Sequence, residues 1–142
     1  MPDYKLVLKE PSAEEKAHLE NSLNHFNMNL TGIPFGGDVA VLVYDDHEHV
    51  VGGVNGWQWG DSFEVGFLWL EQEWRGQDIG TQLIRSLEQQ ATGRGCTQIH
   101  LDTYSFQAID FYLKLGYEVV GTLDNFPTPH KRYFLKKNLP AR

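Results

Sequence analysis

The sequence predicts an α+β, or mixed α/β, protein in which helices pack on a central mixed β-sheet. Three observations lead to this class: a run of three strands in the middle of the chain, helical periodicity on both sides of it, and helices that alternate with strands in the second half. Helices between strands imply crossovers onto a shared sheet. A chain of 142 residues has the ordinary size of one domain, so we expect a single domain over residues 1–142.

The first part of the chain is expected to form a short strand, a helix and a loop. The strand is expected over Tyr4–Leu8. The helix follows Ser12, which forms a capping box with Glu15 and so satisfies free N–H groups at the helix start. Apolar residues then recur at helical spacing on one face. These residues are Leu19, Leu23, Phe26 and Leu30. We expect the helix to fray over residues 27–29 and a loop to follow over residues 31–37.

Three strands are expected in the middle of the chain. Val39–Tyr44 and Val50–Trp59 flank a polar turn, which is typical of a β-hairpin. Gly60 and Asp61 then turn the chain into a third strand, Phe63–Leu70.

The second half is expected to alternate helices with strands. Apolar residues at helical spacing predict helices over Ile79–Ala91 and Phe106–Leu115. The strands are expected over Gln98–Thr103, Glu118–Leu123 and Arg132–Leu135.

Charge and cysteine content narrow the class of protein. The net charge of −7 argues against nucleic acid as the main partner, because phosphate binding needs a lysine and arginine surface. It favours a cationic substrate. The one cysteine, Cys96, excludes an intrachain disulfide and suits a reducing cytosol. No signal peptide is recognisable, and no apolar run approaches the roughly 18–20 residues of a membrane span. We therefore expect a cytoplasmic protein with no membrane partner.

The turn between Phe63–Leu70 and Ile79–Ala91 is the segment most informative for function. The first N–H groups of a helix have no partner within the helix and carry partial positive charge, so such a turn suits a phosphate or pyrophosphate. Gly76 and Gly80 remove side chains where a ligand or a neighbouring backbone would come close. From these residues alone, a purely structural turn stays open as the alternative. The turn is neither a Walker loop nor a dinucleotide fingerprint.

Two motifs, which occur in order along the chain, carry the functional signal. The first is Arg75-Gly76-Gln77-Asp78-Ile79-Gly80, which follows the strand end Leu68–Glu71. It resembles the coenzyme A pyrophosphate loop of the GNAT acetyltransferases, and the strand end looks like the family's bulged fourth strand. Residues 105–117, SFQAIDFYLKLGY, are similar to the family's Asn-x-x-Ala-x-x-Phe-Tyr-x-Lys-x-Gly-Phe/Tyr. The resemblance spans residues 4–135 and implies a GNAT-like sheet in which two parallel strands, Phe63–Leu70 and Gln98–Thr103, splay apart.

The resemblance implies an enzyme of the acyltransferase class. Its members use acetyl-coenzyme A as co-substrate, and here the acetyl group would move to a primary amine by direct transfer through a tetrahedral intermediate. The acidic balance of the chain favours a small cationic acceptor, and a peptide amine stays an alternative. Homodimers are common in the family, so a homodimer stays open beside a monomer. The alternative from another class is a non-catalytic acyl-coenzyme A-binding or regulatory module, because fold alone does not fix function.

The resemblance also assigns residues to the cofactor by position. They are Leu68, Trp69, Leu70, Arg75, Gly76, Gln77, Asp78, Ile79, Gly80, Thr81, Ser105, Ala108, Phe111 and Tyr112. The N–H groups from Gln77 through Thr81 would donate to the pyrophosphate. Asp78 stands where the family's loop normally has glycine, and its carboxylate can either cap the helix or repel phosphate. Ser105 replaces an asparagine that contacts the cofactor arm, and its hydroxyl can still make one hydrogen bond.

The resemblance implies that three residues take part in the acetyl transfer. The N–H of Leu70 would face the thioester carbonyl and stabilise the oxyanion. Tyr112 matches the tyrosine that donates a proton to the leaving thiolate, and a core aromatic is the alternative. Glu64 lies where some family members carry a base. Its alternatives are a solvated carboxylate and a base that acts through a water chain.

Other aromatic and histidine residues leave their roles open. Trp57 and Trp59 share one strand face, and Trp69 follows beyond the turn, so each tryptophan either packs in the core or walls a pocket for a cation. His47 and His49 lie in an acidic turn with no further ligand in view, so we expect no metal site. Asp102 and Tyr104 end the strand that the resemblance places beside the thioester.

Overall fold

The computed structural model describes residues 2–140. The chain divides into two compact units, of which one ends at Pro34 and the other begins at Phe35. The expectation of a single domain over residues 1–142 stays a prediction.

The first unit contains helix α1, Ala13–Thr31. The predicted capping box is confirmed, because the Ser12 hydroxyl accepts from Glu15 N at 3.1 Å and the Glu15 carboxylate accepts from Ser12 N at 2.9 Å. The helix does not fray over residues 27–29. It continues until Gly32, at φ 71°, donates its N–H to Met28 O and ends it. The predicted strand over Tyr4–Leu8 is wrong, since residues 2–12 have no regular secondary structure and an extended segment without a partner strand is not stable.

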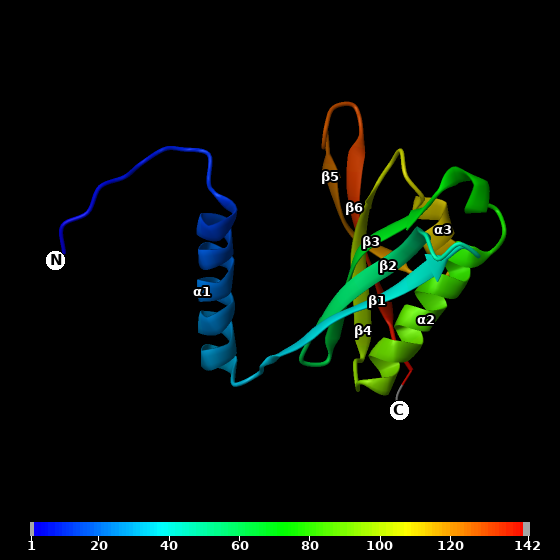
Figure 1. Ribbon diagram of the computed structural model, residues 1–142, viewed down its shortest axis with the longest axis horizontal. Coiled ribbons are helices and arrows are strands. Elements are labelled where there is room, and N and C mark those ends of the chain that lie inside the picture. The colour runs from blue at the N-terminus through cyan, green and yellow to red at the C-terminus, as the bar shows by residue number, and fades with distance from the viewer. Residues whose placement is uncertain (1, 141–142) are drawn as a thin grey trace. The chain divides into compact units, whose positions relative to one another are not determined.

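The second unit is built on a six-stranded mixed sheet with the order β1-β2-β3-β4-β6-β5 (Figure 1). The strands are β1 (Phe35–Tyr44), β2 (Val50–Trp59), β3 (Ser62–Leu70), β4 (Gln98–Tyr104), β5 (Glu118–Asp124) and β6 (Lys131–Asn138). The pair β3–β4 is parallel and the other neighbouring pairs are antiparallel. The predicted mixed class is therefore confirmed.

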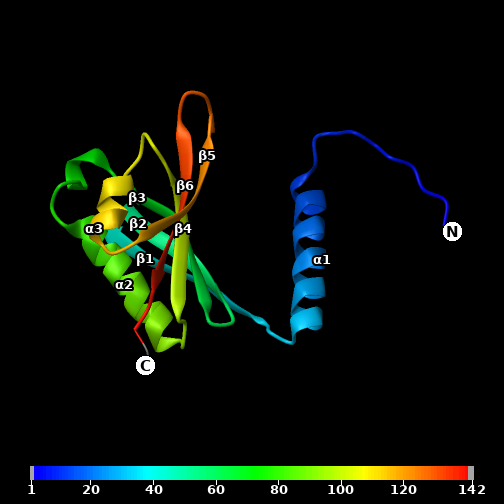
Figure 2. The ribbon, with the colours of Figure 1, turned by 180° about the vertical axis from the view of Figure 1, so that it is seen from behind.

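Two helices of this unit lie on one side of the sheet (Figure 2). Helix α2, Ile79–Gly93, follows β3 and a short 3₁₀ turn, η1 (Gln72–Trp74). Its predicted inward face is confirmed in four buried residues, which are Leu83, Ile84, Leu87 and Ala91. Helix α3, Ile109–Lys114, is shorter than the predicted Phe106–Leu115, because the chain first makes a turn in which Gln107 N donates to Tyr104 O. Within residues 2–140, no helix is both long enough and apolar enough to cross a membrane.

A polar network joins α2 to β6 and to Tyr117, which follows α3 in the chain. The Glu88 carboxylate accepts from the Tyr117 hydroxyl at 2.8 Å and from Lys137 Nζ at 3.1 Å. The Tyr117 ring meets the Tyr112 ring edge to face, with the ring centroids 5.9 Å apart. The network therefore fixes the surroundings of Tyr112, which is buried in the common core.

Candidate functional site

A cleft opens where the pairing between β3 and β4 stops. The parallel ladder joins Ser62–Glu64 to residues 98–100, and within residues 2–140 no β3–β4 pair follows it. Beyond His100, β4 continues to pair with β6 alone, up to Tyr104. The predicted splay of the two parallel strands is therefore confirmed. A cavity of about 1120 Å³ lies between the diverging segments.

A β-bulge in β3 accompanies the divergence. The register between β2 and β3 shifts so that Asn55 alone faces Gly66 and Phe67. Asn55 Oδ1 accepts a hydrogen bond from Phe67 N at 2.6 Å. A Cβ atom at position 66 would lie 2.7 Å from Asn55 Oδ1, so a larger residue there would displace the Asn55 carboxamide from this position. Because a bulge bends its strand, this feature turns the second half of β3 away from β4.

The last residue of β3 presents its backbone to the cavity. Glu71 N donates to Val51 O at 2.9 Å and so points toward β2. Because successive N–H groups along a strand point to opposite edges, the N–H of Leu70 points to the β4 side. The carbonyl of Leu70 accepts from Arg75 Nε at 2.9 Å, and Arg75 lines the cavity. Leu70 therefore offers a backbone donor at the open edge of β3.

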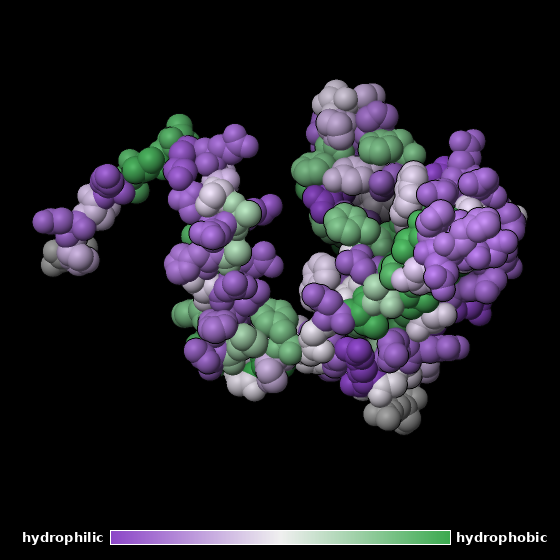
Figure 3. All heavy atoms as spheres, in the orientation of Figure 1, coloured by the Kyte–Doolittle hydropathy of each residue, from purple (hydrophilic) through white to green (hydrophobic). Residues whose placement is uncertain are grey.

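The loop before α2 has two left-handed residues, Gly76 at φ 77° and Asp78 at φ 66°. Of the two roles left open for the Asp78 carboxylate, capping of α2 is not observed, because its side chain makes no cap hydrogen bond. The physical reason is the backbone, since capping side chains normally project from an extended residue. Left-handed residues in such loops turn successive N–H groups toward one point, which attracts anions. The surface of this loop is hydrophilic (Figure 3).

Most residues assigned from the sequence come together around the cavity. Those that line it are Glu64, Leu68, Trp69, Leu70, Arg75, Gly76, Asp78, Ile79, Gly80, Thr81, Ala108, Phe111 and Tyr112. Gln77 does not, because its side chain folds back and Nε2 donates to Glu73 O at 3.2 Å. Ser105 does not either, because its hydroxyl accepts from Lys131 N at 3.0 Å.

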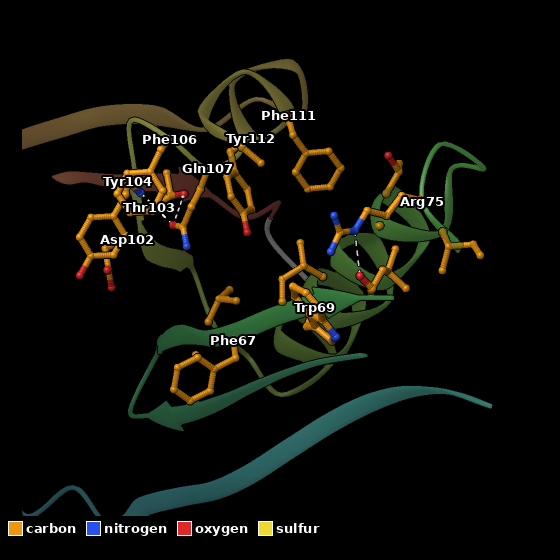
Figure 4. Close-up of a pocket in the computed structure, with 18 of the residues that line it drawn as sticks. Phe67, Trp69, Arg75, Asp102, Thr103, Tyr104, Phe106, Gln107, Phe111 and Tyr112 are labelled. Carbon is orange, nitrogen blue, oxygen red and sulfur yellow. Dashed lines mark hydrogen bonds between the residues drawn. The ribbon is translucent and has the colours of Figure 1, made fainter. Parts of the chain in front are cut away.

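Several residues that line the cavity were not assigned to the site from the sequence. Figure 4 shows four of them, Phe67, Thr103, Phe106 and Gln107. Arg132 is a fifth. Arg132 reaches the cavity because β6 pairs its position with Tyr104 of β4. Its Nε donates to Asp102 Oδ2 at 2.9 Å, and its guanidinium lies 5.7 Å from the Tyr104 ring centroid. Strand alternation could have placed Asp102 and Tyr104 on one face, but no local signal predicts the β4–β6 register.

Tyr112 lies at the inner wall of the cavity. It is 7% exposed, and its ring packs against Phe111 and Tyr117. Its hydroxyl points into the space between α3 and β3 (Figure 4). Burial raises the pKa of Tyr112 to about 12, and the nearby charge of Asp102 adds to the shift. The hydroxyl is therefore protonated at neutral pH and can serve as a proton donor.

Glu64 lies at the last paired position of β3. Partial burial raises the pKa of Glu64, the charge of His100 opposes this shift, and the charge of Asp102 reinforces it. The nearest atoms of Glu64 and His100, Oε1 and Nδ1, are 3.6 Å apart. A carboxylate with increased proton affinity at the edge of a cavity is suited to accept a proton.

The three tryptophans of β2 and β3 divide between two environments. Trp57 and Trp69 line the cavity. Arg75 Cζ lies 4.7 Å from the centroid of the Trp69 ring. Trp59 instead stacks on Phe35 with the ring centroids 5.1 Å apart. Pocket and packing roles are therefore both present.

The turn that holds His47 and His49 is exposed. Asp45 organises it by accepting from the backbone N–H groups of both histidines, at 2.8 and 2.9 Å. Nowhere in the described chain do three or more His, Cys, Asp or Glu side chains gather in a way that could hold a metal ion.

Comparison with known proteins gives one consistent family. The model of an acetyltransferase (GNAT) domain matches residues 37–119. A blasticidin-S acetyltransferase from Streptomyces morookaense is 32% identical over 104 residues, which cover 70% of this chain and 74% of that protein.

Solved structures share the fold. The crystal structure of an acetyltransferase from Bacillus cereus has a TM-score of 0.80 at 29% identity, covering 94% of this chain and 98% of that one. An aminoglycoside 6′-N-acetyltransferase complexed with coenzyme A has a TM-score of 0.66 at 22% identity, covering 92% of this chain and 83% of that one.

Proposed function

Because this chain belongs to the GNAT family of acetyltransferases, we propose that it moves an acetyl group from acetyl-coenzyme A to the amine of a small cationic molecule. The observation that carries the proposal is the cleft beyond Glu64, where β3 and β4 separate around a cavity of about 1120 Å³. Unpaired strand edges supply backbone donors and acceptors to an extended, amide-bearing chain. The pantetheine arm of the co-substrate is such a chain.

The loop before α2 is the proposed site of the pyrophosphate. Its two left-handed residues, Gly76 and Asp78, lie directly before the first turn of a 15-residue helix. The N–H groups from Gln77 through Thr81 would donate to the phosphate oxygens. A Cβ atom at position 80 would make an ordinary contact with the Phe111 ring, at 3.4 Å, so packing alone does not require glycine there.

Three groups of the chain are proposed to carry the transfer. Glu64 would take the proton that the attacking amine must lose, either directly or through water. The N–H of Leu70 would stabilise the negative charge that develops on the carbonyl oxygen. Tyr112 would donate its proton to the departing thiolate, which its protonated state at neutral pH permits.

Aromatic rings and carboxylates surround the proposed acceptor region. Trp57, Phe67 and Tyr104 line the cavity together with Glu64 and Asp102. Rings and carboxylates both attract cations, so the lining favours an amine on a positively charged molecule. The similarity to the blasticidin-S acetyltransferase further supports a small-molecule acceptor, in preference to a peptide.

A thiol-release assay with acetyl-coenzyme A tests the proposal. The acceptor panel should contain blasticidin S, aminoglycosides, polyamines and short peptides with a free amine. We expect release of free thiol, together with a product one acetyl group heavier, for at least one small cationic amine. Turnover confined to peptides would show that the acceptor class is wrong. Binding of coenzyme A with no thiol release for any amine would favour the non-catalytic module.

A further inference from the structure

Ser105 occupies the motif position where the family's asparagine contacts the cofactor arm, but its side chain is engaged elsewhere. Its N–H donates to Lys131 O at 2.9 Å, and its hydroxyl accepts from Lys131 N at 3.0 Å. Both bonds extend the ladder between β4 and β6. Ser105 is also absent from the residues that line the cavity. The polar contact expected at this point of the cleft must therefore come from another side chain.

Gln107, two residues further on, has its carboxamide fixed at the cavity wall. Its Oε1 accepts from Tyr104 N at 2.9 Å and from Thr103 Oγ1 at 3.0 Å. A backbone N–H can only donate, so the atom that faces Tyr104 N must be the oxygen. The orientation of the carboxamide is thus determined by its partners. Thr103, which supplies the second bond, is 3% exposed and holds its position within the core.

This orientation directs the amide nitrogen into the cleft. In Figure 4, Nε2 of Gln107 points away from Thr103 and toward β3. Among residues 2–140, Nε2 has no hydrogen-bond partner, although Gln107 lines the cavity. Two N–H groups therefore face a space that a ligand of the proposed function would enter.

The surroundings of Gln107 select the kind of ligand group. Ala108, Phe111 and Tyr112 follow Gln107 on the cavity wall and carry no charge at neutral pH, and the charged lining residues Asp102 and Arg132 pair with each other at 2.9 Å. A neutral donor in such surroundings matches a neutral carbonyl oxygen better than a phosphate. The proposed phosphate-binding loop, with Gly76 and Asp78, is a different segment of the cavity lining, directly before α2.

We infer that Gln107 is a coenzyme A-binding residue, whose Nε2 donates a hydrogen bond to an amide carbonyl of the pantetheine arm. Gln107 thereby supplies the contact that Ser105 cannot make, because the Ser105 hydroxyl is bonded to Lys131 N. The inference rests on the proposed function, because it needs the arm to lie between β3 and β4. It assigns the contact to a residue that the motif resemblance did not mark.

Gln107→Glu is the most informative variant. The carboxylate keeps an oxygen for Tyr104 N and Thr103 Oγ1, but it replaces the donor by a charged acceptor that repels a carbonyl oxygen. We expect the dissociation constant of coenzyme A, measured by calorimetry, to rise about tenfold or more. Adenosine 3′,5′-bisphosphate lacks the pantetheine arm, so its affinity should not change. Gln89→Glu, which adds the same charge at an exposed position of α2, should bind both ligands like the unmodified protein.

Each other outcome points to a different failure. Equal weakening of both ligands by Gln107→Glu would show a general charge effect and overturn the inference. Loss of coenzyme A affinity in Ser105→Ala, with Gln107→Glu unchanged, would return the contact to Ser105. Failure of the unmodified protein to bind coenzyme A would instead refute the proposed function. A thermal melt of each variant, expected to match the unmodified protein, separates loss of the contact from loss of the fold.

Discussion

The carboxamide oxygen of Asn55 on β2 lies 2.6 Å from the backbone nitrogen of Phe67 on β3 and accepts its hydrogen bond. This bond satisfies a backbone group that the bulge removes from the β2–β3 ladder. The side chain of one strand thus holds the neighbouring strand in the bent path that opens the cleft. Without the Asn55 oxygen, the same N–H would depend on water.

Replacement of Asn55 by alanine tests this role. We expect Asn55→Ala to lower the free energy of unfolding by about 0.5–1.5 kcal/mol, as for a partly exposed hydrogen bond. Coenzyme A affinity should fall about three- to tenfold, because the bent edge of β3 is no longer fixed. Urea unfolding and calorimetry measure the two effects. Asn55→Asp keeps the acceptor and should resemble the unmodified protein. Unchanged affinity in the alanine variant would show that the bulge does not depend on this bond.

Asp78 places a negative charge beside the proposed pyrophosphate, so removing the charge should strengthen binding. Asn tolerates the left-handed backbone of this position nearly as well as glycine does, and Asp78→Asn should therefore fold normally. We expect the dissociation constant of coenzyme A to fall about three- to tenfold at low salt and less at high salt. The matched control is Asp46→Asn in the exposed β1–β2 turn, for which we expect no change. Weaker binding in Asp78→Asn would mean that the carboxylate supports the loop.

Tyr112→Phe removes one hydroxyl and keeps the ring packing against Phe111 and Tyr117. If the hydroxyl donates to the thiolate, kcat should fall about 10²-fold or more, while coenzyme A affinity stays the same. Steady-state kinetics and calorimetry distinguish the two quantities. Tyr133→Phe, a tyrosine that does not line the cavity, is the control and should keep full turnover. Unchanged turnover in Tyr112→Phe would remove this residue from the mechanism.

The pH dependence of kcat/KM tests Glu64 as the base. Activity requires the deprotonated carboxylate, and burial raises its pKa, so activity should fall on acidification at a pH above the ordinary range of a glutamate. The charge of His100 lowers this pKa and that of Asp102 raises it. The fall of kcat/KM on acidification, the acidic limb of the pH profile, should therefore move to higher pH in His100→Asn and to lower pH in Asp102→Asn. Glu64→Gln should reduce turnover and abolish this limb. An acidic limb that persists unchanged in Glu64→Gln would identify another base.

Local features of the chain were predictable from the sequence, whereas features that depend on strand register were not. The bounds of β2, Val50–Trp59, and the start of α2 at Ile79 were predicted to the residue, because turn residues and apolar periodicity mark them locally. The end of α1 was predicted too early, at residues 27–29. The helix continues through these polar residues to Thr31, where Gly32 caps it.

In the candidate site, too, local motifs were predictable, whereas contacts that depend on strand register were not. The family motifs led to the loop before α2 and to Tyr112, which line one cavity. They could not tell that Ser105 turns away from it and Gln107 toward it. That difference is set by the hydrogen bonds of Ser105 to Lys131, 26 residues further along the chain. The pairing of Arg132 with Asp102 likewise follows from a register that no short segment encodes.

The short parallel ladder between β3 and β4 also has a mechanical consequence. Ser62, Phe63 and Glu64 are the only β3 residues in the described chain that join the two halves of the sheet. Three residue pairs resist twisting less than a full-length ladder would, whereas the common core, which includes Phe63, Leu87 and Leu135, packs both halves together. We therefore expect any change in the width of the cleft to occur beyond Glu64, where the hydrogen bonds within β1–β3 and within β4–β6 can stay intact. An extended donor can then enter at a strand edge that is already unpaired, so no strand hydrogen bond has to break to receive it.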